Sequence, residues 1–166
     1  MASDTTDITN KINKELANIV KRSSLDKKLL SQNTEVTYSE FLTNKMLMIS
    51  VITEGVPYSL FNLIQHYTPF TEEYWADFLD ISTKSLHRYK KTSRSFKPIQ
   101  SEKIIEMAEV TKVGLDVFGE MEKFKLGLET PNFSLGNFKP MELLKDSYGK
   151  ELVITEMTRI NYGILV

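Results

Sequence analysis

Our fold prediction starts from the segment 71–97, TEEYWADFLDISTKSLHRYKKTSRSFK. Its first part repeats aromatic and aliphatic residues at helical spacing, which predicts a helix over 71–79. Two turn residues follow. Ser82 can then cap a second helix over 83–91, because its hydroxyl can accept an orphan N–H of the first turn. Two short helices joined by a tight turn are typical of a helix-turn-helix.

The second helix of this segment is dense in cations. Lys84, Arg88 and Lys91 follow an i, i+4, i+7 spacing and therefore share one outer face. A helix-turn-helix needs such an exposed face to reach into a major groove. We predict that the DNA contacts come from Lys84, Ser85, His87, Arg88, Lys91 and Arg94. The residues alone leave a merely solvated cationic face open as the alternative.

Charge is unevenly distributed along the chain. The formal net charge of the 166 residues is −1, yet residues 84–97 hold six cations and no anion, so the remainder carries −7. A local basic patch on an acidic body can attract a phosphate backbone without making the whole protein bind nucleic acid unspecifically. Glu72 and Glu73 in the preceding helix weigh against this prediction, because they would repel phosphates.

Helical spacing dominates the remaining sequence, and we predict an all-α fold. One run, MLMISVI at 46–52, fits a helix face or a buried strand. We divide the chain into an N-terminal arm at 1–37 that is partly disordered, a region at 38–119 with the helix-turn-helix and the dimer contacts, and a small helical domain at 120–166.

The segment 98–118 predicts the longest helix downstream of the basic patch, ended by Gly119. Its apolar residues form two stripes about sixty degrees apart, which is wider than a surface helix needs. The helix is therefore either a central strut or a dimer interface. The candidate dimer contacts are Met107, Val110, Gly114 and Val117.

No residue pattern points to catalysis. The chain has no cysteine, and its two histidines, His66 and His87, lack metal-ligand spacing. There is neither a phosphate-binding glycine loop nor a nucleophile elbow. We therefore expect no enzyme activity, no cofactor and no metal site. The sequence also lacks a signal peptide and a stretch of transmembrane length, so we expect a cytoplasmic protein without membrane contact.

The C-terminal third, TPNFSLGNFKPMELLKDSYGKELVITEMTRINYGILV, resembles the toxin-binding domain of the Xre/MbcA/ParS-like antitoxins. The matching positions are Thr130-Pro131-Asn132, Leu135-Gly136, Pro140 with Leu143-Leu144, Gly149, and Arg159-Ile160 with Gly163. The resemblance extends upstream and covers residues 38–166. Two positions depart from the family pattern. Gly127 stands where tryptophan is common, and Asn137 replaces a second glycine.

This resemblance implies the antitoxin of a type II toxin–antitoxin system. It implies a dimer whose helix-turn-helix region binds its own promoter and whose C-terminal domain binds a RES-domain toxin. Such toxins are similar in fold to ADP-ribosyltransferases and act on NAD. The expected toxin contacts are Asn132, Leu135, Arg159, Tyr162, Ile164 and Val166. For Arg159, an internal salt bridge is an equal alternative. The rival functions are a stand-alone helix-turn-helix regulator and a helical adaptor that no longer binds DNA.

Overall fold

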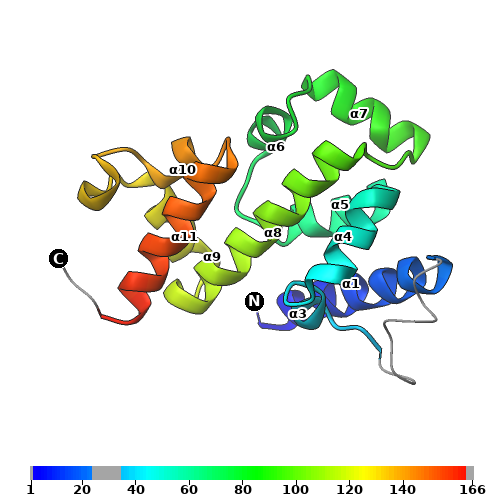
Figure 1. Cartoon of the computed structure of the whole chain (residues 1–166), viewed down its shortest axis with the longest axis horizontal. Helices are drawn as coiled ribbons and strands as arrows, with labels where there is room; N and C mark the ends of the chain where they lie inside the picture. Colours follow the sequence, from blue (N-terminus) through cyan, green and yellow to red (C-terminus); the bar gives the residue numbers. More distant parts are fainter. Residues whose placement is uncertain (1, 24–34, 164–166) are drawn as a thin grey trace.

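The computed structural model describes residues 2–23 and 35–163 of the chain (Figure 1). Within these ranges the chain forms ten α-helices, one short 3-10 helix and no strand, which confirms the predicted all-α class. In chain order the elements are α1 (Ala2–Arg22), α3 (Tyr38–Phe41), α4 (Lys45–Glu54), α5 (Tyr58–His66), α6 (Glu72–Phe78), α7 (Thr83–Thr92), α8 (Pro98–Phe118), α9 (Met121–Glu129), η1 (Phe133–Leu135), α10 (Pro140–Leu143) and α11 (Ser147–Asn161).

Helix α8 is the element on which both halves of the molecule are built. It packs against α4 and α5 on the N-terminal side and against α9 and α11 on the C-terminal side. Figure 1 shows it crossing the middle of the structure. Its bounds agree with the predicted helix. Pro98 occupies the first turn, where its missing N–H costs nothing, and Gly119 ends the helix with φ 74°.

The residues predicted as dimer contacts lie inside this core. Met107 and Val110 are fully buried. A Cβ at Gly114 would lie 2.2 Å from the Phe124 ring, so the glycine permits close approach of α9. Val117 is half-buried against the core. A second copy could not reach Met107, Val110 or Gly114 without opening the core, and these three residues belong to a central strut. Val117 is partly accessible, and a dimer contact there stays a prediction.

The N-terminal arm differs from the predicted partly disordered segment. Helix α1 begins at Ala2, and Ile12 and Leu16 are fully buried where it packs against α5. The Asn13 side chain also accepts a hydrogen bond from the Tyr38 backbone, at 2.7 Å. The polar residues at 2–10 are helical because this amphipathic helix is fixed by tertiary packing, which outweighs weak local propensity. Residues 24–34 lie outside the described ranges.

The run at 46–52 belongs to helix α4, which settles the alternative that the sequence left open. Asn44 caps the helix, since its side chain accepts a hydrogen bond from Leu47 N at 3.2 Å. Met48 and Val51 are buried, whereas Ile49 is exposed. The buried face of α4 therefore contains Met48 and Val51 and leaves Ile49 on the outer side.

The C-terminal region is helical, as predicted. Asp146 caps α11 by accepting a hydrogen bond from Gly149 N at 2.8 Å, and Val153 and Met157 are buried, whereas Ile160 is exposed. A Cβ at Gly127 would lie 2.7 Å from Phe118 Cζ. Phe118 therefore fills the space beside Gly127, where the resemblance led us to expect a tryptophan.

Polar contacts fix α11 along α8. Lys103 pairs with Glu106 at 3.0 Å, and Ser147 at the start of α11 donates to the other Glu106 oxygen at 3.0 Å. Lys150 pairs with Glu109 at 2.7 Å. Because these groups are largely shielded from solvent, the pairs specify how the two helices align. The division of the chain at residue 119 stays a prediction.

Candidate nucleic-acid interface and protein-docking face

Helices α6 and α7 form the helix-turn-helix. The hydroxyls of Thr71 and Ser82 cap the two helices, each accepting a backbone hydrogen bond from the residue three positions on. In the turn, Asp80 has φ 51°, and the Ile81 N–H donates to the Ala76 carbonyl at 3.0 Å. This is a Schellman arrangement with Asp80 at the position that glycine usually occupies.

The outer face of α7 carries the predicted cations. Lys84, Arg88 and Lys91 are all exposed, while Leu86 is buried on the opposite side. Within the described residues neither Lys84 nor Lys91 forms an ion pair. Arg88 donates only to the Ser85 hydroxyl, at 3.4 Å. The structure thus brings three cations together on one helix face, with their charge open to solvent.

The other three predicted DNA contacts lie at the margins of this face. Ser85 is half-buried, and its hydroxyl bonds to Ser82 as well as to Arg88. Arg94 follows the helix; its side chain is exposed and its carbonyl accepts from Tyr58 N at 3.2 Å. His87 pairs through Nε2 with Glu72 on α6 and is the least available of the six.

Two acidic residues begin α6 beside the basic face. The pKa of the Glu73 carboxyl is held below its usual value because its own backbone N–H and the Thr71 side chain donate hydrogen bonds to it. Glu72 is paired with His87 Nε2. Both carboxylates also favour the positive end of the helix dipole. Because both carboxylates stabilise the first turn of α6, acidic residues are tolerated at this place in the helix-turn-helix.

The basic helix is held by residues that the sequence analysis did not single out as functional. Tyr89 stacks on Phe96 with ring centroids 4.3 Å apart. The side chain of Gln100 on α8 accepts from the Tyr89 hydroxyl and donates to the Leu79 carbonyl, each at 3.3 Å. One side chain therefore ties α7 and the turn to the central helix. Only the short spacing between Tyr89 and Gln100 could have signalled this contact.

A short antiparallel bridge fixes the segment after α7. Phe96 N donates to the Val56 carbonyl at 2.8 Å, and the buried Ser101 hydroxyl accepts from Val56 N at 2.8 Å. Gly55 has φ 92°, and a Cβ there would lie 2.4 Å from the Phe96 carbonyl oxygen. The two loops can meet only because residue 55 is glycine.

The predicted toxin-contact residues fall into three groups. Asn132 and Arg159 both contact Glu156, at 3.5 Å each, so Arg159 forms the internal salt bridge that the sequence left open. Leu135 is half-buried against the core, and Tyr162 is exposed. Two further predicted contacts, Ile164 and Val166, lie outside the described residues.

Four large exposed apolar side chains of the C-terminal region were missed in the sequence analysis, whereas Tyr162 was predicted. On the loop that holds η1, Phe133 is 85% exposed, and Phe138 also faces solvent. Tyr148, Leu152 and Tyr162 share one face of α11, with 83% of Tyr148 exposed. We name Phe133, Phe138, Tyr148, Leu152 and Tyr162 the apolar face. Exposed aromatic side chains in such number mark interaction surfaces.

The described residues show neither a metal site nor a membrane span. They contain no group of three or more His, Cys, Asp or Glu side chains that could hold a metal ion. No helix in residues 2–23 and 35–163 is both long and apolar enough to cross a bilayer. What the structure offers instead is the basic face of α7 and the apolar face of the C-terminal region.

The comparisons with known proteins address the first of these faces. Residues 47–109 match the model of the antitoxin Xre-like helix-turn-helix domain, a non-enzymatic binding domain. A chain of the crystal structure of the M. tuberculosis MbcT–MbcA toxin–antitoxin complex is similar at 20% identity and a TM-score of 0.49. The match covers 74% of this chain and 99% of that chain. Likeness at this level does not establish a shared function. No curated protein matches in sequence.

Proposed function

We propose, from the antitoxin Xre-like helix-turn-helix domain that residues 47–109 form, that this protein is the antitoxin of a type II toxin–antitoxin system. It neutralises a cognate RES-domain toxin by direct binding and represses its own operon through α7. The family match confirms the predicted resemblance for the helix-turn-helix region. The RES identity of the toxin and the autorepression rest on the resemblance of residues 38–166 and on the two surfaces.

The basic face supports DNA binding. Its three exposed cations, Lys84, Arg88 and Lys91, lie on a helix whose opposite side is anchored by Leu86 and Tyr89. A helix fixed in this way can enter a major groove without first being ordered. Helix-turn-helix repressors commonly bind two half-sites as dimers. We therefore keep a homodimer in the proposal, with contacts drawn from surface residues and not from the buried stripe of α8.

The apolar face supports toxin binding, and it is the observation that carries the antitoxin function. Tyrosine and arginine are enriched among the residues that dominate binding energy at protein interfaces. Here Tyr148 and Tyr162 lie on the same face of α11 as Arg159, whose side chain remains 36% exposed beside Glu156. Toxin binding gives this exposed apolar surface a partner.

Co-expression tests the proposal. The neighbouring gene, expressed alone in a bacterial host, should arrest growth and deplete NAD. Co-expression with this protein should restore growth, and the two proteins should copurify. If the neighbouring protein is harmless and does not bind, the antitoxin proposal is wrong.

The alternative is a stand-alone helix-turn-helix regulator. It is favoured by the basic face, which needs no toxin to act on DNA. Specific promoter binding, together with failure to bind the neighbouring protein, would support this alternative.

A further inference from the structure

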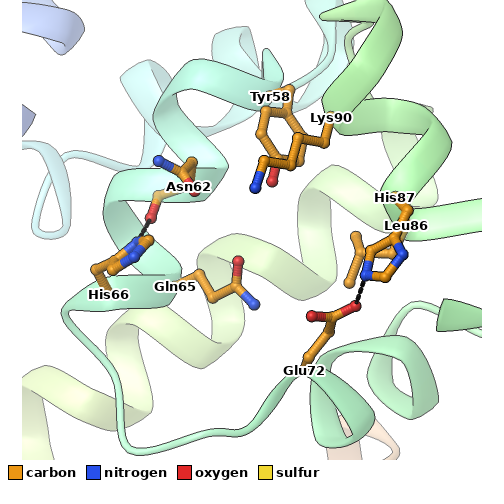
Figure 2. Close-up of a pocket in the computed structure, with 8 residues that line it drawn as sticks. All are labelled: Tyr58, Asn62, Gln65, His66, Glu72, Leu86, His87 and Lys90. Atoms are coloured by element: carbon orange, nitrogen blue, oxygen red, sulfur yellow. Dashed lines mark hydrogen bonds and ion pairs between the residues drawn. The ribbon is translucent and has the colours of Figure 1, made fainter.

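A polar cleft opens beside the basic helix, between α5, the start of α6 and α7. Its volume is about 280 Å³, and α5 contributes Tyr58, Asn62 and Gln65 to its wall. Figure 2 shows the side chains of Gln65 and Lys90 reaching into this space from two different helices. None of these four residues belongs to the predicted DNA-contact set, so the cleft is a second feature of the helix-turn-helix region.

The hydrogen-bond donors of the cleft are unused. Among the described residues, no hydrogen-bond or ion-pair partner is found for the donor groups on three side chains: Tyr58, Gln65 and Lys90. Burial, followed by the nearby Glu72 charge, raises the pKa of the Tyr58 hydroxyl, so it stays protonated and can donate. An ammonium, an amide and a phenol therefore face one open volume together.

Two other contacts of the cleft wall are already made. His87 pairs with the Glu72 carboxylate at one edge of the cleft, as Figure 2 shows. The backbone carbonyl of Asn62 accepts a hydrogen bond from His66 Nδ1 at 2.6 Å. The three unpaired donors, one of them the Lys90 ammonium, favour a ligand that brings acceptors and a negative charge. A phosphate group has both.

We propose that this cleft binds one phosphate group, supplied by the DNA backbone that lies along α7, with Lys90 as the counter-charge and Gln65 and Tyr58 as hydrogen-bond donors. This inference rests on the proposed DNA binding. Lys90 belongs to the same helix as Lys84, Arg88 and Lys91 but lies on its flank toward α5. A duplex whose major groove receives the outer face would pass its backbone over that flank.

The roles of the two side chains give different signatures in a salt titration. Binding of the full-length protein to fluorescent promoter DNA is measured by anisotropy between 50 and 200 mM salt. Lys90→Ala should weaken binding roughly five- to tenfold near 0.1 M salt and lower the slope of log K against log salt by about 0.9. Gln65→Ala should weaken binding about threefold at unchanged slope, because it removes a neutral donor. Lys139→Ala, an exposed lysine near the C-terminal loop, is the matched control and should change neither value.

A substitution of Glu72 should change DNA affinity in the opposite direction. Glu72→Gln removes a negative charge from the cleft and releases His87, so it should tighten DNA binding about threefold, with every DNA sequence affected equally. Thermal unfolding of each variant separates a binding effect from lost structure. Gln65 is half-buried and Lys90 is exposed, so both variants should fold.

The outcomes separate this proposal from the DNA-binding function itself. If Arg88→Ala weakens binding while Lys90→Ala behaves like Lys139→Ala, the cleft proposal is overturned and DNA binding stands. If the wild-type protein binds no promoter DNA, the backbone source is overturned. An NMR titration with inorganic phosphate then decides the chemistry. Shifts of the His66 and His87 ring signals that vanish in Lys90→Ala would assign the cleft to a free phosphate ester, and absent shifts would dismiss a phosphate site.

Discussion

The two proposed interactions of this chain use surfaces of different chemistry. In our proposal, DNA is bound by the basic face of α7, and the toxin is bound by the apolar face of the C-terminal region. Among the described residues, the cations of the basic face have no charged partner, and their helix is anchored by Tyr89 and Gln100. The apolar face carries aromatic side chains around one internal salt bridge, between Glu156 and Arg159. Long-range charge suits a polyanion of any sequence, whereas exposed aromatic area suits a shaped protein surface. The contrast predicts that each interaction can be removed without the other.

The largest effect should come from the apolar face. Replacing Tyr148 and Tyr162 by Ala together should cost about 4 kcal/mol of toxin-binding free energy, because both are exposed aromatic anchors. Isothermal titration calorimetry with the purified toxin measures the loss. Promoter affinity should be unchanged. A parallel loss of DNA binding would show that the two faces are not independent.

Substitutions in the basic face should weaken promoter binding and leave toxin binding unchanged, with a smaller loss of binding free energy. Arg88→Ala with Lys91→Ala removes two cations and should weaken promoter binding by about 2 kcal/mol near 0.1 M salt, with a salt slope lower by about two. Toxin affinity should stay at the wild-type value. An unchanged promoter affinity would count against α7 as the recognition helix.

The join between the two faces is tested at Gly114. Gly114→Ala adds a methyl group 2.2 Å from the Phe124 ring, and overpacking of this kind costs about 2 kcal/mol of unfolding free energy. Urea denaturation measures it. Both interactions should weaken only as far as the folded fraction falls. A stable variant with altered mass in solution would instead revive a dimer contact at this position.

The smallest effect should be a gain in stability that leaves both interactions alone. Asp80 holds φ 51° in the turn of the helix-turn-helix, and Asp80→Gly removes the steric cost of that conformation. We expect the melting temperature to rise, with about 0.5 kcal/mol added to the free energy of unfolding. A fall would mean that the Asp80 side chain stabilises the turn by a contact of its own.

Sequence patterns predicted the bounds of the helices better than the contacts that each helix makes. The bounds of α7 and α8 follow from local signals: the Ser82 cap, Pro98 and Gly119. The sequence of α8 could not show whether its apolar residues face the core or a second copy of the chain, because both kinds of surface have the same composition. The packing of α4, α9 and α11 on α8 decides it, with Phe124 of α9 lying against Gly114.

The sites divide in the same way. Cations at helical spacing on an exposed helix were recognisable, since charge is rarely buried. The pairing of His87 with Glu72 depends on how α6 crosses α7, which no spacing reveals. The apolar face was missed because Phe133, Tyr148 and Leu152 look like ordinary core residues in a sequence. The arm at 2–22 was predicted too loosely, because its stability comes from packing against α5.

The central claim is that one chain binds a toxin and DNA through separate surfaces. The most direct test is copurification of the neighbouring gene product with three forms of this protein: wild type, the Arg88→Ala/Lys91→Ala variant and the Tyr148→Ala/Tyr162→Ala variant. The account predicts a stable complex with the first two and none with the third, with all three folded. A complex lost in the Arg88→Ala/Lys91→Ala variant, or kept in full by the Tyr148→Ala/Tyr162→Ala variant, would contradict it.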